Sequence, residues 1–127
     1  MTTRNRVLFA EDDRFFRRAG EMALQDAGIE VMTAVDGEDA LRIARTQSPD
    51  LILLDVLMPK LDGFEVLRAL KNDPLTRDID VIMLSNLHEG MDVVMARAAG
   101  ARSYLVKADL SLPALVAAVG EALGAAR

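Results

Sequence analysis

Ionisable and hydroxyl side chains follow four short aliphatic runs of this sequence. In chain order they are Glu11, Asp12, Asp13, Asp55, Ser85 and Lys107. Asp55 stands out because it places a charge between two apolar segments, Leu51–Leu54 and Val56–Met58. An acid after a strand often serves only to cap the next helix, and this explanation suffices for Asp13. It does not explain why three further carboxylates, which repel one another at close range, should gather in one place.

These residue types together indicate chemistry on a phosphoryl group beside a bound divalent cation. Glu11, Asp12 and Asp55 carry three negative charges and Lys107 carries one positive charge, so a divalent cation would neutralise the set. Oxygen ligands without cysteine favour a hard ion, and few protein ligands suit Mg²⁺ better than Ca²⁺. An aspartate can attack phosphorus and form an aspartyl phosphate. A lysine and a hydroxyl can then donate hydrogen bonds to the phosphoryl oxygens.

The elements that must bring these side chains together are five short, mostly aliphatic runs. We expect strands at Arg6–Ala10, Glu30–Ala34, Leu51–Leu54, Val81–Leu84 and Ser103–Val106. Between them, apolar residues recur every three or four positions, which predicts helices. Five strand–helix pairs predict an α/β fold, a doubly wound parallel sheet of flavodoxin-like order 2-1-3-4-5 between two layers of helices. Ligands bind such a sheet at the carboxyl ends of its strands.

The expected helices carry signals at their ends and along their faces. Gly28 and Gly100 are natural C-terminal stops for the first and fourth helices, and Ser111 is a suitable N-cap for the fifth. In the fourth helix, the apolar residues at helical spacing are Met91, Val94, Met95 and Ala98. We expect core packing for its methionines, because an apolar stripe on a helix usually faces the core.

The composition indicates one domain without a membrane or nucleic-acid surface. The chain has 127 residues and a net charge of −5 at pH 7, the wrong sign for binding a phosphate backbone. It has no cysteine, which excludes disulfides and thiolate metal sites. Its longest uncharged stretch, Leu110–Gly120, is too short to cross a bilayer. We expect a single domain over residues 1–127, a cytoplasmic location, no direct nucleic-acid partner and no membrane insertion.

Four motifs of the sequence resemble those of receiver (response-regulator) domains of bacterial two-component signalling. They are Glu11-Asp12-Asp13, Leu54–Pro59 followed by Asp62-Gly63, Ser85, and Tyr104–Lys107. The resemblance extends over nearly the whole chain, from Arg4 to Leu123. It implies a chemotaxis-regulator-like protein that takes a phosphoryl group from a sensor histidine kinase or a histidine phosphotransfer protein. Such a protein catalyses only its own phosphorylation and dephosphorylation.

By this resemblance, Asp55 is the phosphoacceptor and lies in a Mg²⁺ site. Asp12 and Asp55 would bind the ion directly, and Glu11 would help through water. The backbone carbonyl of Leu57 would be a further ligand. The resemblance thus implies the same cation that the charges of the acids favour.

The resemblance also implies which residues respond to the phosphoryl group. Ser85 would bind it, Lys107 would pair with it, and Tyr104 would be the aromatic residue whose rotamer accompanies activation. Phosphorylation would switch a protein-binding surface built from the fourth helix, the fifth strand and the fifth helix. The partner that reads this surface is not named by the sequence.

Three positions depart from the commonest pattern of the family. Asp80 precedes the fourth strand, where proline is common, and we expect this change to be harmless. Asn86 stands after Ser85, where alanine or glycine is usual. With Leu57 and Leu87 it offers no acid or base to orient a hydrolytic water, which predicts a long-lived phosphoryl group. Ala108 follows Lys107 where a proline, often after a cis bond, is typical. Because cis bonds are costly without proline, we expect a trans bond with the lysine still directed toward Asp55.

Other interpretations stay open at this point. A Mg²⁺-dependent phosphohydrolase with an aspartate nucleophile is one, although haloacid-dehalogenase-type enzymes place D-x-D-x-T where this chain has Glu11-Asp12-Asp13-Arg14-Phe15. A serine–histidine–aspartate triad would require His88, for which an exposed loop position is the simpler interpretation. The chain could also be a receiver cut from a larger hybrid kinase or transcription regulator. Its start at Met1 and its end at Arg127 favour a stand-alone protein.

Overall fold

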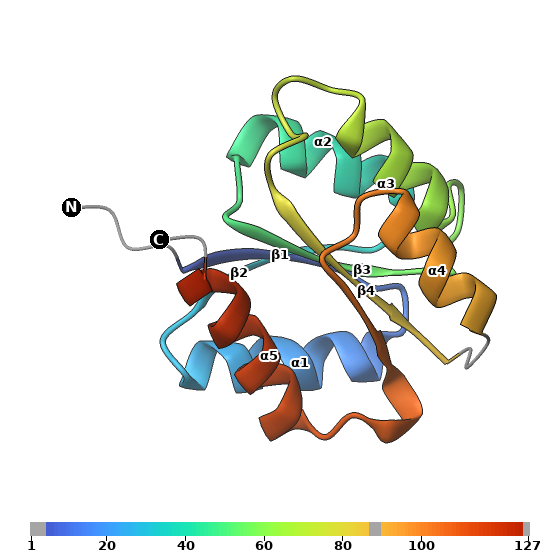
Figure 1. The fold of residues 1–127 in the computed structure, drawn as a ribbon. Helices are drawn as coiled ribbons and strands as arrows, with labels where there is room; N and C mark the ends of the chain where they lie inside the picture. Colours follow the sequence, from blue (N-terminus) through green and yellow to red (C-terminus); the bar gives the residue numbers. More distant parts are fainter. Residues whose placement is uncertain (1–4, 87–89, 126–127) are drawn as a thin grey trace.

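The computed structural model describes residues 5–86 and 90–125, in which five strands alternate with five helices (Figure 1). The strands are β1 (Arg6–Ala10), β2 (Glu30–Ala34), β3 (Leu51–Asp55), β4 (Asp80–Ser85) and β5 (Ser103–Val106). The helices are α1 (Arg14–Asp26), α2 (Gly37–Gln47), α3 (Gly63–Lys71), α4 (Gly90–Ala98) and α5 (Leu112–Ala125). A short 3-10 turn, Lys107–Asp109, links β5 to α5. Within the described ranges, no helix is both long and apolar enough to span a membrane.

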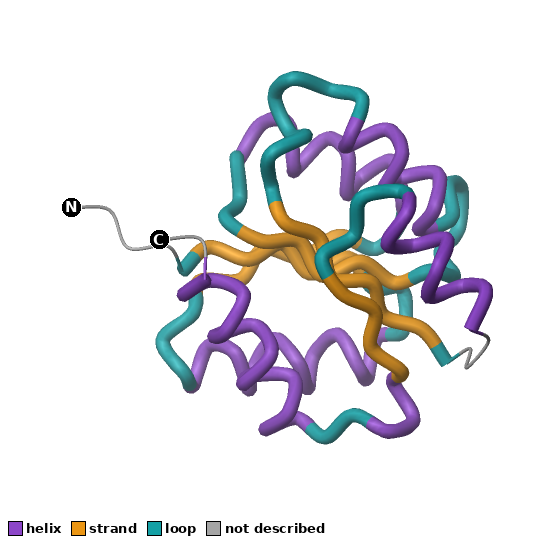
Figure 2. Tube along the Cα trace, viewed as in Figure 1, coloured by secondary structure: helices purple, strands orange, loops and turns teal. Residues whose placement is uncertain are grey.

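The described strands form one parallel sheet in the order β2-β1-β3-β4-β5. This confirms the predicted doubly wound, flavodoxin-like fold. Helices α1 and α5 cover one face of the sheet, and α2, α3 and α4 cover the other, so the molecule has three layers (Figures 1 and 2). Because all strands are parallel, the residues that follow them meet at one edge of the sheet.

The two faces of the sheet have separate apolar cores, because side chains alternate along each strand. On β1, Leu8 and Ala10 pack into the core beneath α2, α3 and α4. Val7 and Phe9 pack into the core beneath α1 and α5. The central strands are therefore buried on both faces, which explains why they read as continuous aliphatic runs rather than alternating ones.

The predicted helix signals are confirmed at four positions. Asp13 caps α1 by accepting from two backbone N–H groups of its first turn. Ser111 does the same for α5, accepting one such bond at 3.1 Å. Gly28 and Gly100 follow α1 and α4 with φ angles of 84° and 106°. These left-handed conformations strain residues that have a Cβ atom, so glycine suits both helix ends.

Two strands are longer than predicted. β3 continues through Asp55, and β4 begins at Asp80 and ends at Ser85. The ladder between them pairs Leu51 with Asp80 and Asp55 with Leu84. Backbone pairing does not depend on side-chain polarity, so the polar residues at the ends of the aliphatic runs are held in the sheet. Asp55 and Ser85 are therefore terminal strand residues with fixed backbones.

The predicted core packing of Met95 on α4 is wrong. Ala96 is fully buried, whereas Val94 is 62% exposed and Met95 is 46% exposed. The side chain of Met91 lies outside the described residues. Apolar residues occur on both sides of this helix, and the small Ala96 side chain packs into the core while Val94 and Met95 remain exposed. The expected core packing of Met95 is therefore not found, and α4 presents an apolar stripe to solvent.

Candidate functional site

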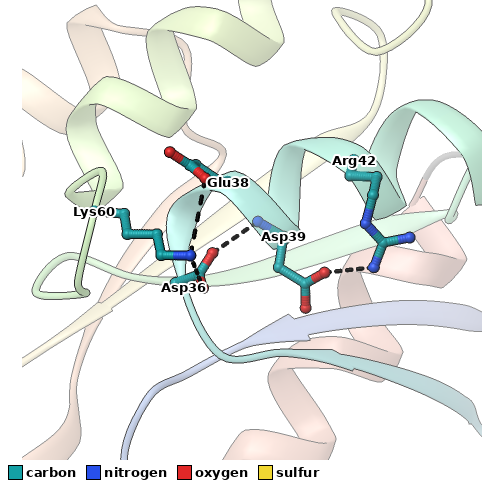
Figure 3. Close-up of a pocket in the computed structure, with 5 residues that line it drawn as sticks. All are labelled: Asp36, Glu38, Asp39, Arg42 and Lys60. Carbon is teal, nitrogen blue, oxygen red and sulfur yellow. Dashed lines mark hydrogen bonds and ion pairs between the residues drawn. The ribbon is translucent and has the colours of Figure 1, made fainter.

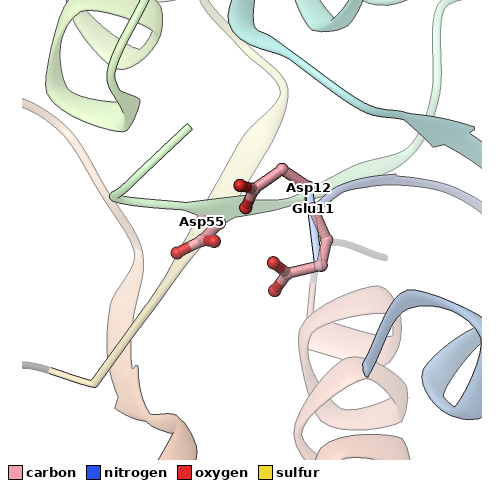
Figure 4. Close-up of side chains that lie close together, drawn as sticks. All are labelled: Glu11, Asp12 and Asp55. Carbon is pink, nitrogen blue, oxygen red and sulfur yellow. The ribbon is translucent and has the colours of Figure 1, made fainter. Parts of the chain in front are cut away.

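Five of the predicted site residues lie at the carboxyl edge of the sheet. Glu11 and Asp12 follow β1, Asp55 ends β3, Ser85 ends β4 and Lys107 follows β5. The carboxylate groups of the three acids each place an oxygen within 4.8 Å of the others (Figure 4). The topology therefore brings together side chains that are far apart in the sequence.

Burial differs between the three acids. Glu11 is fully buried and Asp55 is only 4% exposed, whereas Asp12 is exposed. Ser85, at the end of the neighbouring strand, is also buried. We call this set the acidic recess, because Glu11 and Asp55 lie below the protein surface and Asp12 lies at the surface. Two carboxylates out of water require a compensating positive charge.

Lys107 supplies that charge. Its Nζ lies 2.5 Å from Oε1 of Glu11 and 3.0 Å from Oδ2 of Asp55, and its side chain is only 12% exposed. The peptide bonds of the described residues are all trans, including the one between Lys107 and Ala108. The predicted trans bond and the predicted direction of the lysine toward Asp55 are therefore confirmed.

The electrostatics of the recess follow from this burial. Burial and the neighbouring Asp55 raise the pKa of Glu11 from 4.5 to about 7, although Lys107 and the N–H of Asp13 act in the opposite direction. Burial lowers the pKa of Lys107, but its contacts with Glu11 and Asp55 outweigh this, and its pKa is raised above 10.5. Lys107 therefore stays charged, and Glu11 takes up a proton at a higher pH than an exposed glutamate does.

The metal-free protein is expected to lose stability through Glu11 as the pH rises from 4.5 through about 7. Its raised pKa means that the folded state binds the proton more tightly than the unfolded chain does. This stabilisation is complete below a pH of 4.5 and is lost as the pH rises through about 7. Glu11→Gln, which has the shape and charge of the protonated acid, should flatten the loss. Urea unfolding in a chelator checks this, and an equally steep loss in the variant contradicts it.

The segment after β3 holds the Asp55 carboxylate in place. The N–H of Leu57 donates to Oδ1 of Asp55 at 3.3 Å, and the N–H of Gly63 donates to the carbonyl of Val56 at 2.7 Å. A Cβ atom at Gly63 would overlap the backbone carbonyl of Asp55. The first turn of α3 therefore packs directly on the backbone of the site, and only glycine allows this approach.

The donor set fits a Mg²⁺ ion. It consists of oxygen atoms only, and the buried Oε1 of Glu11 has no well-aligned hydrogen bond among the described residues. The exposed carboxylate of Asp12 leaves room for water ligands, which Mg²⁺ usually keeps. The acidic cluster could therefore hold this cation.

The structure also describes three further predicted residues, Tyr104, Asn86 and Leu57. Tyr104 is on β5, partly buried, and packs against the core beneath α4. Asn86 is exposed, directly after Ser85, and the Leu57 side chain is 60% exposed. Leu87 and His88 lie outside the described residues, so the predictions that concern them stay predictions.

Phe16 is a neighbour of the site that the sequence did not reveal. The Nζ atom of Lys107 lies over its ring, 5.1 Å from the ring centroid. In the sequence, Phe16 is one of several apolar residues at helical spacing, and such a residue normally indicates core packing alone. No local motif distinguishes it from its neighbours.

A second hollow, of about 400 Å³, lies at the start of α2 (Figure 3). It is lined by Asp36, Glu38, Asp39, Arg42 and Lys60. These charges already pair with one another, Lys60 with Asp36 and Glu38, and Arg42 with Asp39. The side chains that line the hollow therefore have partners within it, and they give no indication of a bound ligand.

Comparison with known proteins shows to which family the chain is similar. The family model of the response regulator receiver domain matches residues 7–119. The transcriptional regulatory protein AfsQ1 of Streptomyces coelicolor is 43% identical over 101 residues, which are 80% of this chain and 44% of that protein. The response regulator PleD of Caulobacter vibrioides is 42% identical over 102 residues, 80% of this chain and 22% of that protein. The chain thus spans less than half the length of these relatives.

Solved structures share the whole fold. The receiver domain of the Francisella response regulator 1452 superposes with a TM-score of 0.90 at 28% identity, covering 97% of this chain and 99% of that one. The chemotaxis response regulator CheY4 of Vibrio cholerae gives a TM-score of 0.87 at 32% identity, covering 94% of this chain and 99% of that one. By its sequence match, its fold and its acidic recess, this chain belongs to the receiver-domain family of two-component response regulators.

Proposed function

We propose that this chain is a phosphoacceptor receiver, which takes a phosphoryl group from a phosphohistidine donor onto Asp55. The observation that supports this best is the surroundings of the Asp55 carboxylate. It is recessed, it lies 3.0 Å from the ammonium of Lys107, and two further carboxylates flank it. A nucleophile with a fixed cation beside it suits an incoming phosphoryl group, whose charge must be stabilised during transfer.

The acids would hold the Mg²⁺ ion that such a transfer requires. Asp12, Asp55 and the carbonyl of Leu57 would bind it directly, and Glu11 would act through water. When bound, the ion supplies positive charge that offsets the repulsion between the carboxylates and the phosphoryl group.

The transfer itself needs one bond to form and one to break. An oxygen of Asp55 attacks phosphorus, and the bond from phosphorus to the donor's imidazole nitrogen breaks. The electron pair of that bond stays on the imidazole, which leaves neutral because its other nitrogen carries a proton. Lys107 and the hydroxyl of Ser85 donate hydrogen bonds to the phosphoryl oxygens.

Phosphorylation would then act on a binding surface at α4, β5 and α5. Ser85 and Tyr104 connect the site to this surface, since Ser85 ends β4 and Tyr104 lies on the neighbouring strand β5. The exposed Val94 and Met95 of α4 provide apolar contact area for an output protein. The identity of that protein and the cytoplasmic location stay predictions, as does the extent of the domain over residues 1–127.

The proposal is tested by incubating the protein with acetyl phosphate, or with a phosphorylated histidine kinase, in the presence of Mg²⁺. We expect one shifted band on a phosphate-affinity gel. Hydroxylamine should remove it, because an acyl phosphate is cleaved by this nucleophile. A chelator should prevent its formation. A protein that gives no shifted band with any donor, although it is folded, would contradict the proposal.

The phosphoryl group is expected to be lost severalfold faster from Asn86→Ala than from the unmodified protein. Asn86 is exposed directly after Ser85, Leu57 is exposed two residues after Asp55, and neither side chain is an acid or base that could orient a water molecule. Removing the Asn86 side chain opens the approach. Release of inorganic phosphate from the purified phosphoprotein measures both lifetimes. Slower release from the variant would show that Asn86 instead assists hydrolysis.

A further inference from the structure

The Lys107 ammonium has an aromatic neighbour in addition to its two carboxylates. Its Nζ lies over the Phe16 ring, 5.1 Å from the centroid. This is within the distance at which the negative face of an aromatic ring attracts a cation. The lysine side chain is only 12% exposed, and the attraction is stronger where water is excluded.

Phe16 is held by a contact of its ring and by a hydrogen bond of its backbone. Its edge-to-face contact with the fully buried Phe9 has a centroid distance of 5.8 Å and an interplanar angle of 80°. Its backbone N–H donates to Oδ1 of Asp13, the residue that caps α1, at 3.3 Å. Phe16 therefore has a fixed position, whereas a lysine stem is long and flexible.

The three partners of the ammonium differ in what the reaction does to them. Glu11 and Asp55 would both contribute to the metal site, and Asp55 would also carry the phosphoryl group. The bound metal ion would then compete with the ammonium for both carboxylates. Phosphorylation would change the charge of Asp55. The Phe16 ring is uncharged and takes part in neither process, so its attraction for the ammonium would remain.

We infer that Phe16 is a positioning residue, whose ring keeps the Lys107 ammonium at the site when Glu11 and Asp55 are engaged by metal or phosphoryl group. The inference rests on the proposed function for its role in the reaction. The contact between ring and ammonium can be tested separately, by unfolding, without any phosphorylation.

The test replaces Phe16 with mono-, di- and trifluorinated phenylalanine, which weaken the negative face of the ring stepwise with little change in shape. Each protein is unfolded in urea, with a chelator and with Mg²⁺. We expect the unfolding equilibrium constant to rise stepwise, by about two- to fivefold in total, as the cation–ring attraction is lost. The same series in Lys107→Met, which keeps the stem and removes the charge, should show no such electrostatic trend.

Two controls separate the attraction from packing. Lys107→Arg keeps a cation that also binds aromatic faces, so the stepwise trend should persist in it. Phe64 packs into the core on the opposite face of the sheet, and its fluorination should have the same effect in the unmodified and Lys107→Met proteins.

The outcomes are distinct. The inference is supported if the unfolding constant rises with fluorination only when position 107 carries a cation, both with a chelator and with Mg²⁺. Identical trends in the unmodified and Lys107→Met proteins overturn it, because they show an effect of packing alone. A trend that disappears in Mg²⁺ also overturns it, since the ring would then not hold the lysine in the loaded site. A protein that fails to accept phosphoryl groups contradicts the proposed function and leaves the unfolding result interpretable.

Discussion

Asp55→Asn is expected to abolish phosphorylation by acetyl phosphate and by a histidine kinase while leaving the fold intact. An amide has the shape of the carboxylate but is not a nucleophile toward phosphorus. Its oxygen can still accept the hydrogen bond from the N–H of Leu57. The substitution also removes one of three neighbouring negative charges, which relieves repulsion. A phosphate-affinity gel measures the loss, and urea unfolding shows whether stability is retained.

A matched control is Asp62→Asn, in the segment between β3 and α3. Asp62 caps α3 by accepting from the N–H of Glu65 at 2.9 Å, and asparagine caps a helix about as well as aspartate. This variant removes the same charge from the same segment and should be phosphorylated normally. A shifted band of undiminished intensity from Asp55→Asn would refute the assignment of the phosphoacceptor. Loss of the band in both variants would show that it depends on the segment rather than on Asp55 itself.

The sheet could be predicted because its strands are buried on both faces. In a chain whose remaining segments have helical periodicity, aliphatic runs such as Leu51–Leu54 are most simply explained as strands of a parallel sheet covered on both faces. The ranges of β1, β2 and β5 agree with prediction, and β3 and β4 differ only at their polar ends. The orientation of α4 could not be predicted, because this helix has apolar residues on both sides. Packing against the sheet decides that Ala96 is buried and Met95 is exposed. The spacing of apolar residues carries no information about this packing.

The candidate site could be predicted in outline because parallel strands place their carboxyl ends together. This principle alone brings Asp55, Ser85 and Lys107 to one edge of the sheet. It does not say which acids are buried, so the full burial of Glu11 and its contact with Lys107 were not foreseen. The position of Phe16 beneath the ammonium depends on how α1 packs, and its residue type alone suggests only a core position. The contacts of Lys107 with Glu11 and Phe16 join residues far apart in the sequence, so no local sequence pattern predicts them.

Mg²⁺ is expected to stabilise the fold and to do so through Asp12. At about one hundred times its dissociation constant, a ligand that binds only the folded state adds about 2.7 kcal/mol to the free energy of unfolding. For a domain of this size, that corresponds to a rise of about 10 °C in Tm. Asp12→Asn should lose most of this rise. Thermal unfolding with Mg²⁺ and with a chelator measures it.

Asp12 is the most informative acid for this test because it lies at the protein surface. The two ion pairs of the Lys107 ammonium are with Glu11 and Asp55, so Asp12→Asn changes an expected metal ligand and leaves these ion pairs in place. The matched control is Asp13→Asn, which removes the neighbouring charge at a helix cap that asparagine also serves. It should retain the full response to Mg²⁺. If Asp12→Asn and Asp13→Asn lose the Mg²⁺-dependent rise in Tm equally, the ion is attracted only by the net charge of the protein. If the Tm of the unmodified protein does not respond to millimolar Mg²⁺, the acidic recess holds no metal site.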